Sequence, residues 1–268
     1  MGRYNNWDNC IELSAKAKKH TAYNANFQQD NINRCIEESK IYGRDIEHNY
    51  FTPSVYDYTT NIIVAPTDSV NAAMEAKQNN LGKICILNFA SYKNPGGGFI
   101  SGSSAQEESL CHASILYNIL AAFKDTYYAE NGIIGYNKGL YNNRAIYTPD
   151  VIFFDDNPNC KLYKFDVLTC AAPNNSVGLR YGKFTREENK DALEDRIMFV
   201  LDIMNQNNVD TAILGAYGCG VFMQNPHEVA EIFFNLLRSG KYNFKNAIFP
   251  IPGGNNLKVF QDVLQKYV

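Results

Sequence analysis

The chain has 268 residues, of which 45% are hydrophobic and 20% charged, and its formal net charge is −3. These values are typical of a globular protein with enough material for one large domain or two small ones. The acidic balance disfavours non-specific binding to a nucleic-acid backbone. No apolar run is long enough to span a bilayer, and the first residues lack the apolar segment of a signal peptide. We therefore expect no membrane partner.

The seven cysteines are far apart in the sequence and form no Cys-x-x-Cys pair, and the four histidines lack the spacing of metal ligands. Cys85 and Cys170 lie inside apolar runs, where a thiol is usually a small core side chain. We expect no disulfide framework, no metal site and a reducing, cytoplasmic location.

The first 55 residues are polar, with weak helical patterns at residues 10–19 and 31–41. They are interpreted as a helical N-terminal extension (residues 1–55) that packs on a main domain (residues 56–268). A helix at residues 67–79, capped by Thr67 or Asp68 and stopped by Gly82, opens the regular part of that domain.

Beyond this point, apolar runs alternate with amphipathic stretches. Strands are predicted at residues 62–64, 83–89, 151–154, 165–170, 211–215 and 247–251. Helices are predicted at residues 105–123, 187–205, 226–237 and 256–267, and the rest of 125–160 is predicted to be mostly loop. Strands that alternate with helices of these lengths predict an α/β fold with a mainly parallel sheet covered on both faces.

The first of two glycine-rich loops follows the strand at residues 83–89. Gly96, Gly97 and Gly98 can take positive φ angles and let a ligand approach the backbone closely. Glu107 and Glu108 then stand where the next helix begins, a place where the helix dipole alone would favour glutamates. Their position beside a bare loop favours a site that contains a general acid.

The second loop, residues 215–222, also joins a strand to a helix, which is the geometry that presents backbone amides to a phosphate. Its Gly-x-x-Gly-x-Gly pattern is compatible with a tight turn as well, and it is neither a Walker nor a Rossmann fingerprint. Cys219 in this loop is either a packing residue or a reactive thiol, and Phe222 is either a core aromatic or a ligand contact.

Gly96, Gly97 and Gly98, followed after seven residues by Gln106-Glu107-Glu108, match the signature of poly(ADP-ribose) glycohydrolases. Residues 88–99, 147–151, 169–174 and 215–222 resemble the compact bacterial-type branch of that family, in the family's order. The resemblance implies a macrodomain-like fold, a three-layer α/β/α sandwich with a mixed, mainly parallel sheet. It also implies that ADP-ribose binds across the carboxyl ends of the strands.

By the same resemblance, Glu108 is the catalytic acid/base. It would protonate the departing ribose oxygen and then activate water against an oxocarbenium-like cation. Glu107 would hold the ribose hydroxyls, and the second loop would cradle the diphosphate. The substrate-binding residues that the resemblance implies are Asn88, Ser91, Gly96, Gly97, Gly98, Gln106, Gly215, Tyr217, Gly218, Cys219, Gly220, Val221 and Phe222.

The function that the sequence predicts is hydrolysis of ribose–ribose O-glycosidic bonds in poly(ADP-ribose), exo-acting, by a monomer without a cofactor. Two alternatives stay open: a hydrolase of single ADP-ribose groups on proteins or nucleic-acid bases, and a non-catalytic ADP-ribose-binding module. Retention of both Glu107 and Glu108 counts against the module. The Tyr-rich segment 127–147 is a candidate for stacking on adenine, and His112 is expected on the surface or in the core.

Overall fold

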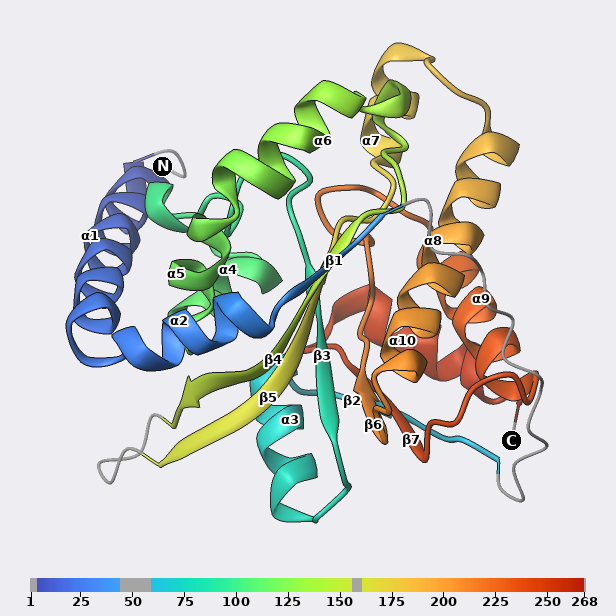
Figure 1. Cartoon of the computed structure of the whole chain (residues 1–268). Coiled ribbons are helices and arrows are strands. Elements are labelled where there is room, and N and C mark those ends of the chain that lie inside the picture. Colours follow the sequence, from blue (N-terminus) through green and yellow to red (C-terminus); the bar gives the residue numbers. More distant parts are fainter. Residues whose placement is uncertain (1–3, 44–58, 156–160, 268) are drawn as a thin grey trace.

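The computed structural model describes residues 4–43, 59–155 and 161–267, and in these residues seven strands form one sheet between two layers of helices (Figure 1). The strands are β1 (Lys40–Tyr42), β2 (Asn61–Ala65), β3 (Ile84–Phe89), β4 (Ala145–Phe154), β5 (Leu162–Cys170), β6 (Thr211–Ile213) and β7 (Asn246–Pro250). The α-helices are α1 (Tyr4–Phe27), α2 (Gln29–Glu38), α3 (Ser69–Gln78), α4 (Gln106–His112), α5 (Leu116–Ala122), α6 (Ala129–Ile134), α7 (Asn175–Tyr181), α8 (Arg186–Gln206), α9 (Pro226–Arg238) and α10 (Gly254–Leu264).

The sheet is mixed and mainly parallel, as predicted, with the order β1-β4-β5-β3-β6-β7-β2. The pairs from β5 to β2 are parallel, whereas β4 is antiparallel to both β5 and β1. In β3, Cys85 and Leu87 pack into the core shared with α8, α9 and α10, and Ile84 and Ile86 pack into the core shared with α2 to α5. Both faces of this strand are therefore buried, which explains its continuous apolar run.

The single helix predicted at residues 105–123 is wrong, because the structure has two helices there, α4 and α5. Ser114 lies at the break. Its hydroxyl donates to the Leu110 carbonyl (2.6 Å) and accepts from the Leu116 amide (3.1 Å), and Ser114 also forms an isolated bridge with Phe153. A serine that bonds its own backbone in this way competes with the helical pattern.

The prediction of mostly loop over residues 125–160 is also wrong. A π-helix, η2 (Lys124–Tyr128), runs into α6, a 3₁₀ turn, η3 (Asn137–Gly139), follows, and β4 begins six residues earlier than predicted. A bulge between Thr148 and Val151 hid this strand, since Pro149 breaks the apolar alternation and Asp150 has a φ of +51°.

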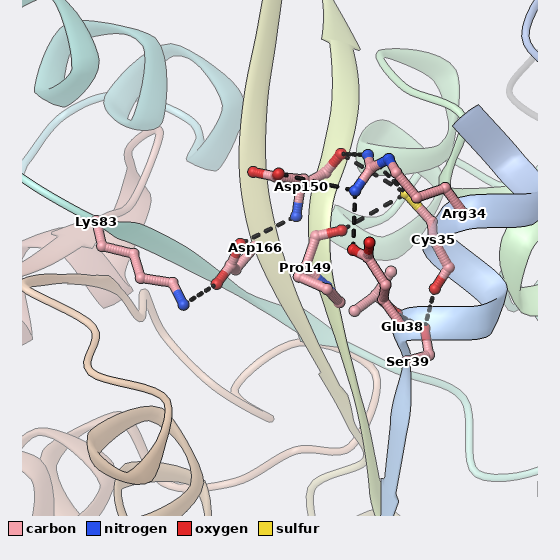
Figure 2. A network of polar contacts seen from close by, with 9 residues as sticks. Arg34, Cys35, Glu38, Ser39, Lys83, Pro149, Asp150 and Asp166 are labelled. Carbon is pink, nitrogen blue, oxygen red and sulfur yellow. Dashed lines mark hydrogen bonds and ion pairs between the residues drawn. The ribbon is translucent and has the colours of Figure 1, made fainter. Parts of the chain in front are cut away.

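Helix α2 packs against this bulge and forms hydrogen bonds with it (Figure 2). The Arg34 guanidinium donates to the Asp150 carbonyl (3.0 Å), while the Asp150 amide donates to the buried Asp166 carboxylate (3.0 Å). Lys83 forms an ion pair with the same carboxylate, at 3.1 Å from its Nζ. Because Lys83 immediately precedes β3, these contacts lie at the amino ends of the parallel strands, opposite to their carboxyl ends.

The N-terminal segment adds β1 to the edge of the sheet, next to β4, and packs α1 and α2 against the body of the protein (Figure 1). The predicted boundary at residue 55 lies outside the described residues. Within the described residues, no helix is both long and apolar enough to cross a membrane.

Candidate active site

A cavity of about 1080 Å³ lies where the parallel strands β3, β6, β7 and β2 end. Loops that leave the carboxyl ends of adjacent parallel strands meet at one edge of a sheet, and ligands of α/β proteins bind there. The predicted site residues that line the cavity are Ser91, Gly97, Gly98, Gln106, Glu107, Glu108, Gly218, Gly220, Val221 and Phe222. The structure thus brings both glycine loops and both glutamates to one place.

The other predicted site residues, Asn88, Gly96, Gly215, Tyr217 and Cys219, do not line the cavity. Asn88 is fully buried, and its amide donates to Glu107 Oε1 (3.2 Å). The buried Tyr217 hydroxyl donates to the Cys170 carbonyl (3.0 Å), and burial raises the pKa of the Cys219 thiol to about 12. These side chains pack against the loops on the side away from the cavity. Cys219 is not an activated thiol.

The cavity is also lined by residues outside the predicted set of site residues. At one end the cavity is lined by the start of α3 and the loop after β7, including Asp68, Val70, Pro252 and Asn256. At the other end it is lined by Tyr92, Lys93 and Tyr141. The first group follows the carboxyl ends of predicted parallel strands, so its place at the cavity could have been predicted from the sequence. In the second group, Tyr92 and Lys93 follow the predicted strand β3, so their place could have been predicted in the same way. Tyr141 lies in the Tyr-rich segment 127–147 that the sequence singled out, but it precedes β4, whose start was not predicted.

Glu107 is held rigidly behind the first loop. Only 3% of its surface is exposed, and its two oxygens accept from the Asn88 side chain and from the Ser91 amide (2.8 Å). Burial, reinforced by the charge of Glu108, raises the pKa of Glu107 to about 8, although the hydrogen bonds from Ser91 and Asn88 oppose this shift. Glu107 therefore carries a proton near neutral pH.

Glu108 bridges the two ends of the first loop. Its Oε1 accepts from the Gly98 amide (2.8 Å), and its Oε2 accepts from the amide of Ala105, the N-cap residue of α4 (2.9 Å). This is the backward reach of a third-position glutamate in a capping box. The Glu108 carboxylate is thus fixed by backbone groups at both sides of the loop, with 6% of the residue exposed toward the cavity.

Gly97 is the point where the two carboxylates meet. A Cβ built on Gly97 would lie 2.6 Å from Glu108 Oε1 and 2.8 Å from Glu107 Oε2, and the residue has a φ of +59°. Both oxygens therefore converge under a residue that must be glycine. The adjacent Gln106 completes this support, because its side chain accepts from the Phe89 amide and donates to the Leu87 carbonyl (both 2.9 Å).

Helix α1 braces the first loop from outside. The Ser14 hydroxyl donates to the Ile100 carbonyl (2.6 Å), and the carbonyl of Cys10 lies so close to Gly102 that a Cβ there would overlap it. His112, at the end of α4, packs edge-on against Phe99 with 4.6 Å between ring centroids and does not line the cavity. Burial lowers the pKa of His112, so this ring is neutral near pH 7.

In the second loop, backbone conformation and neighbouring side chains require glycine at some positions but not at all of them. Gly215 and Gly218 have positive φ angles, and a Cβ on either would approach a neighbouring side chain within 3 Å. Gly220 has no left-handed φ, and nothing lies within 4 Å of a Cβ built there. Gly220 lines open space in the cavity, which suits a backbone amide that receives a ligand.

No group of three or more His, Cys, Asp or Glu side chains that could hold a metal ion occurs in residues 4–43, 59–155 and 161–267. Between the two glycine loops, the chemistry available to the cavity is that of the Glu107 and Glu108 carboxyl groups, backbone amides and aromatic rings, while the third carboxylate, Asp68, caps α3. This set can protonate a leaving group, activate water and hold an anion.

Comparison with known proteins identifies the family. The family model described as the catalytic domain of microbial-type PARG, poly(ADP-ribose) glycohydrolase, matches residues 11–156, more than half of the chain. The chain belongs to this family. It is therefore a glycosidase of the class that hydrolyses ribose–ribose bonds. No curated protein sequence matches the chain.

Solved structures of bacterial family members share the whole fold. The poly(ADP-ribose) glycohydrolase from Thermomonospora curvata is 25% identical, with a TM-score of 0.80 over 94% of this chain and 99% of that one. The structure of that enzyme with the inhibitor ADP-HPD is 27% identical, with a TM-score of 0.79 over the same shares. The Deinococcus radiodurans enzyme in complex with ADP-ribose is 27% identical, with a TM-score of 0.79 over 88% of this chain and 98% of that one.

Proposed function

We propose that this glycohydrolase removes terminal ADP-ribose units from poly(ADP-ribose), with Glu108 as the acid/base. The observation that carries the proposal is the convergence of Glu107 Oε2 and Glu108 Oε1 under Gly97, at the wall of the cavity. Support for the ligand comes from the related bacterial enzymes, whose structures hold ADP-ribose or the inhibitor ADP-HPD.

In the proposed reaction, Glu108 protonates the ribose oxygen of the leaving unit while the C–O bond to the terminal ribose breaks. The resulting cation is oxocarbenium-like, and the Glu108 carboxylate then takes a proton from the water that attacks it.

Glu107 takes the holding role in this proposal. Because it is protonated near neutral pH and fixed by Asn88 and Ser91, it presents a neutral carboxyl group to the ribose hydroxyls. Phe222, the last residue of the second loop, lines the cavity and packs edge-on against Tyr141, with 6.0 Å between ring centroids. This placement suits a ring that orients the terminal ribose.

We further propose that the enzyme acts as a monomer in the cytoplasm. The cysteines among the described residues are free thiols, which fits a reducing compartment.

The test is a substrate panel of poly(ADP-ribose), a mono-ADP-ribosylated protein and ADP-ribosylated DNA, with free ADP-ribose measured by chromatography. An exo-acting enzyme releases ADP-ribose from the polymer from the first time point, without short oligomers. Release from the base-linked or protein-linked substrate alone would replace this proposal by the mono-ADP-ribosyl hydrolase. Binding of ADP-ribose without release from any substrate would indicate the non-catalytic module.

A further inference from the structure

Arg196, on α8, is a fully buried cation that the hydrolysis proposed above does not use. Only 1% of its surface is exposed. Its guanidinium donates to the side-chain oxygen of Asn143 (2.7 Å) and to the backbone carbonyls of Leu140 (3.5 Å) and Ala171. In the part of the chain that the structure describes, no carboxylate forms an ion pair with it. Because burying an unpaired charge costs free energy, the position of Arg196 calls for a role besides stability.

The three acceptors of Arg196 belong to two segments that reach the cavity. Leu140 and Asn143 flank Tyr141, which lines the cavity, whereas Ala171 directly follows β5. Tyr141 and Ala171 pack in one apolar cluster. Burial raises the pKa of Tyr141, and the charge of Arg196 opposes this rise. The guanidinium therefore lies close behind this part of the cavity wall.

Both segments meet at Phe222, the end of the second loop. The Phe222 ring packs edge-on against the Tyr141 ring, with 6.0 Å between centroids. The Phe222 carbonyl accepts from the amide of Ser176 (3.1 Å), in the segment after β5. In the same way, the Gln224 side chain donates to the carbonyl of Pro173 (2.8 Å). The segment before β4 thus supports the ring of Phe222, and the segment after β5 holds its backbone.

One guanidinium therefore joins α8 to both segments that support Phe222. Resting on the proposed function, in which Phe222 orients the terminal ribose, we infer that Arg196 is a positioning residue that fixes the Phe222 ring at the cavity wall. It acts through Tyr141 and the segment after β5, since Arg196 itself does not line the cavity. An arginine suits this task because its donors point in fixed directions within one plane, which lets it bind several acceptors at once.

The binding test compares ADP-ribose with ADP, which carries the same adenosine and diphosphate but lacks the terminal ribose. Arg196→Met removes the donors and the charge and keeps a long unbranched side chain. Calorimetry should show that this variant binds ADP-ribose about tenfold more weakly and binds ADP within about twofold of the wild type. Equal losses for both ligands would overturn the inference, because a general disturbance of the cavity, or an action of the charge on the diphosphate, affects both.

Arg196→Lys separates geometry from charge. This variant keeps the positive charge but loses the planar group that reaches three acceptors. We expect it to lose at least half of the ADP-ribose affinity that Arg196→Met loses, on a logarithmic scale, again with little change for ADP. A full return to the wild-type affinity would assign the effect to charge and would overturn the positioning role.

A double-mutant cycle tests whether Arg196 acts through Phe222. Phe222→Ala and Arg196→Met should each lower kcat on poly(ADP-ribose) about tenfold, since both leave the terminal ribose less well oriented. The double variant should be no slower than the slower single variant, because residues that act through one another have non-additive effects. A hundredfold loss in the double variant, the product of the two single effects, would contradict the inference.

Arg238→Met is the matched control for loss of a guanidinium that binds backbone carbonyls. Arg238 donates to the carbonyls of Thr60 (3.2 Å) and Tyr267 (3.4 Å) and does not line the cavity. Its replacement should lower Tm and leave the affinities for ADP-ribose and ADP unchanged. A selective loss of ADP-ribose binding in this control would show that such a loss follows from destabilisation alone and would overturn the inference.

A milder variant covers the case in which Arg196→Met does not fold, since that change leaves buried acceptors without a donor. Asn143 is only half-buried, and Asn143→Ala removes one of the three acceptors of Arg196. It should weaken binding of ADP-ribose about twofold to threefold and leave ADP unaffected. Wild-type affinity for ADP-ribose in this variant would then count against the positioning role.

The positioning role and the hydrolase proposal fail in different ways. If the wild-type protein releases no ADP-ribose from the polymer, the hydrolase proposal fails, and the comparison of ADP-ribose with ADP still tests Arg196. If the wild type hydrolyses the polymer and Arg196→Met weakens both ligands alike, only the positioning role fails.

Discussion

The two glycine loops line the same cavity but depend on the rest of the protein to different degrees. Away from the cavity, the first loop is packed against Glu107 and Glu108, α1 and Ser103, which lies against Gly98. The second has Gly220 at its open end, with nothing within 4 Å of a Cβ built there. The first loop therefore needs its glycines to fold around the carboxylates, whereas Gly220 is required only if a ligand approaches it.

The largest effect is expected at Glu108, the proposed acid/base, which is held against the first loop. Glu108→Gln keeps the shape and one hydrogen-bond acceptor but cannot protonate the leaving oxygen, so kcat should fall on the order of 10³-fold. Binding of ADP-ribose, measured by calorimetry, should change by less than about threefold, since in the proposed binding mode the second loop holds the diphosphate.

Glu107→Gln is the matched control, because Glu107 is already neutral near pH 7. An amide resembles a protonated carboxyl group, so this variant should lose only about tenfold in kcat. If Glu107→Gln were inactive and Glu108→Gln active, the two roles would have to be exchanged.

Gly97→Ala should produce the next largest effect. The new Cβ would push against both carboxylates, and a φ of +59° is strained for alanine by about 1 kcal/mol. A displacement of the catalytic groups by about an ångström can cost on the order of a hundredfold in rate. We expect that loss in kcat together with a lower Tm. Wild-type kcat would show that the oxygens near Gly97 do not take part in the reaction.

Gly220→Ala separates ligand contact from folding in the second loop. Because the residue has ordinary backbone angles and free space around it, Tm should stay within about 1 °C of the wild type. The added methyl group would occupy the position of the diphosphate, so ADP-ribose should bind about tenfold more weakly. Unchanged affinity would remove Gly220 from the phosphate site and would erase the contrast between the loops.

The burial of Glu107 makes the first loop sensitive to pH. Its folded-state pKa of about 8 lies above the ordinary value of 4.5, so between these values the folded protein holds a proton that the unfolded chain has released. The contribution of this group to stability is therefore complete below about pH 4.5 and is lost as the pH rises toward 8, by at most about 1.4 kcal/mol per pH unit. Urea unfolding of the wild type and Glu107→Gln at several pH values measures it. An equal pH dependence in the variant would contradict the assignment.

Much of the cavity could be predicted because its parts are local in sequence. The apolar run of β3, the three glycines and the capping glutamates lie within residues 83–108, so one strand–loop–helix unit positions both carboxyl groups. The second loop follows the same logic after β6. The family signature covers these segments, which is why the sequence indicated their chemistry.

The remaining parts depend on contacts between distant segments. Tyr141 reaches the cavity only because β4 pairs with β5 in antiparallel register, and the bulge at Asp150 concealed that strand. Likewise, the weak helical pattern at residues 10–19 gave no sign that α1 would touch the first loop. Asn88 was expected at the ligand. It is the last residue but one of the buried strand β3, and its side-chain amide points to Glu107. No pattern within one segment reports such pairings.

The brace from α1 offers the smallest test of how firmly the first loop is held. Ser14→Ala removes the hydrogen bond to the Ile100 carbonyl and should cost about 1 kcal/mol, or about 2–4 °C in Tm. Ser239→Ala is the matched control, since the Ser239 hydroxyl donates a bond of the same length, 2.6 Å, to the Leu236 carbonyl and accepts from the Lys241 amide (3.3 Å), both at its own helix end and far from the cavity. If α1 positions the loop, Ser14→Ala should also lower kcat about twofold to threefold, because the Gly98 amide that holds Glu108 lies two residues from Ile100. A fall in Tm without any change in kcat would show that α1 stabilises the fold and leaves the carboxylates in place.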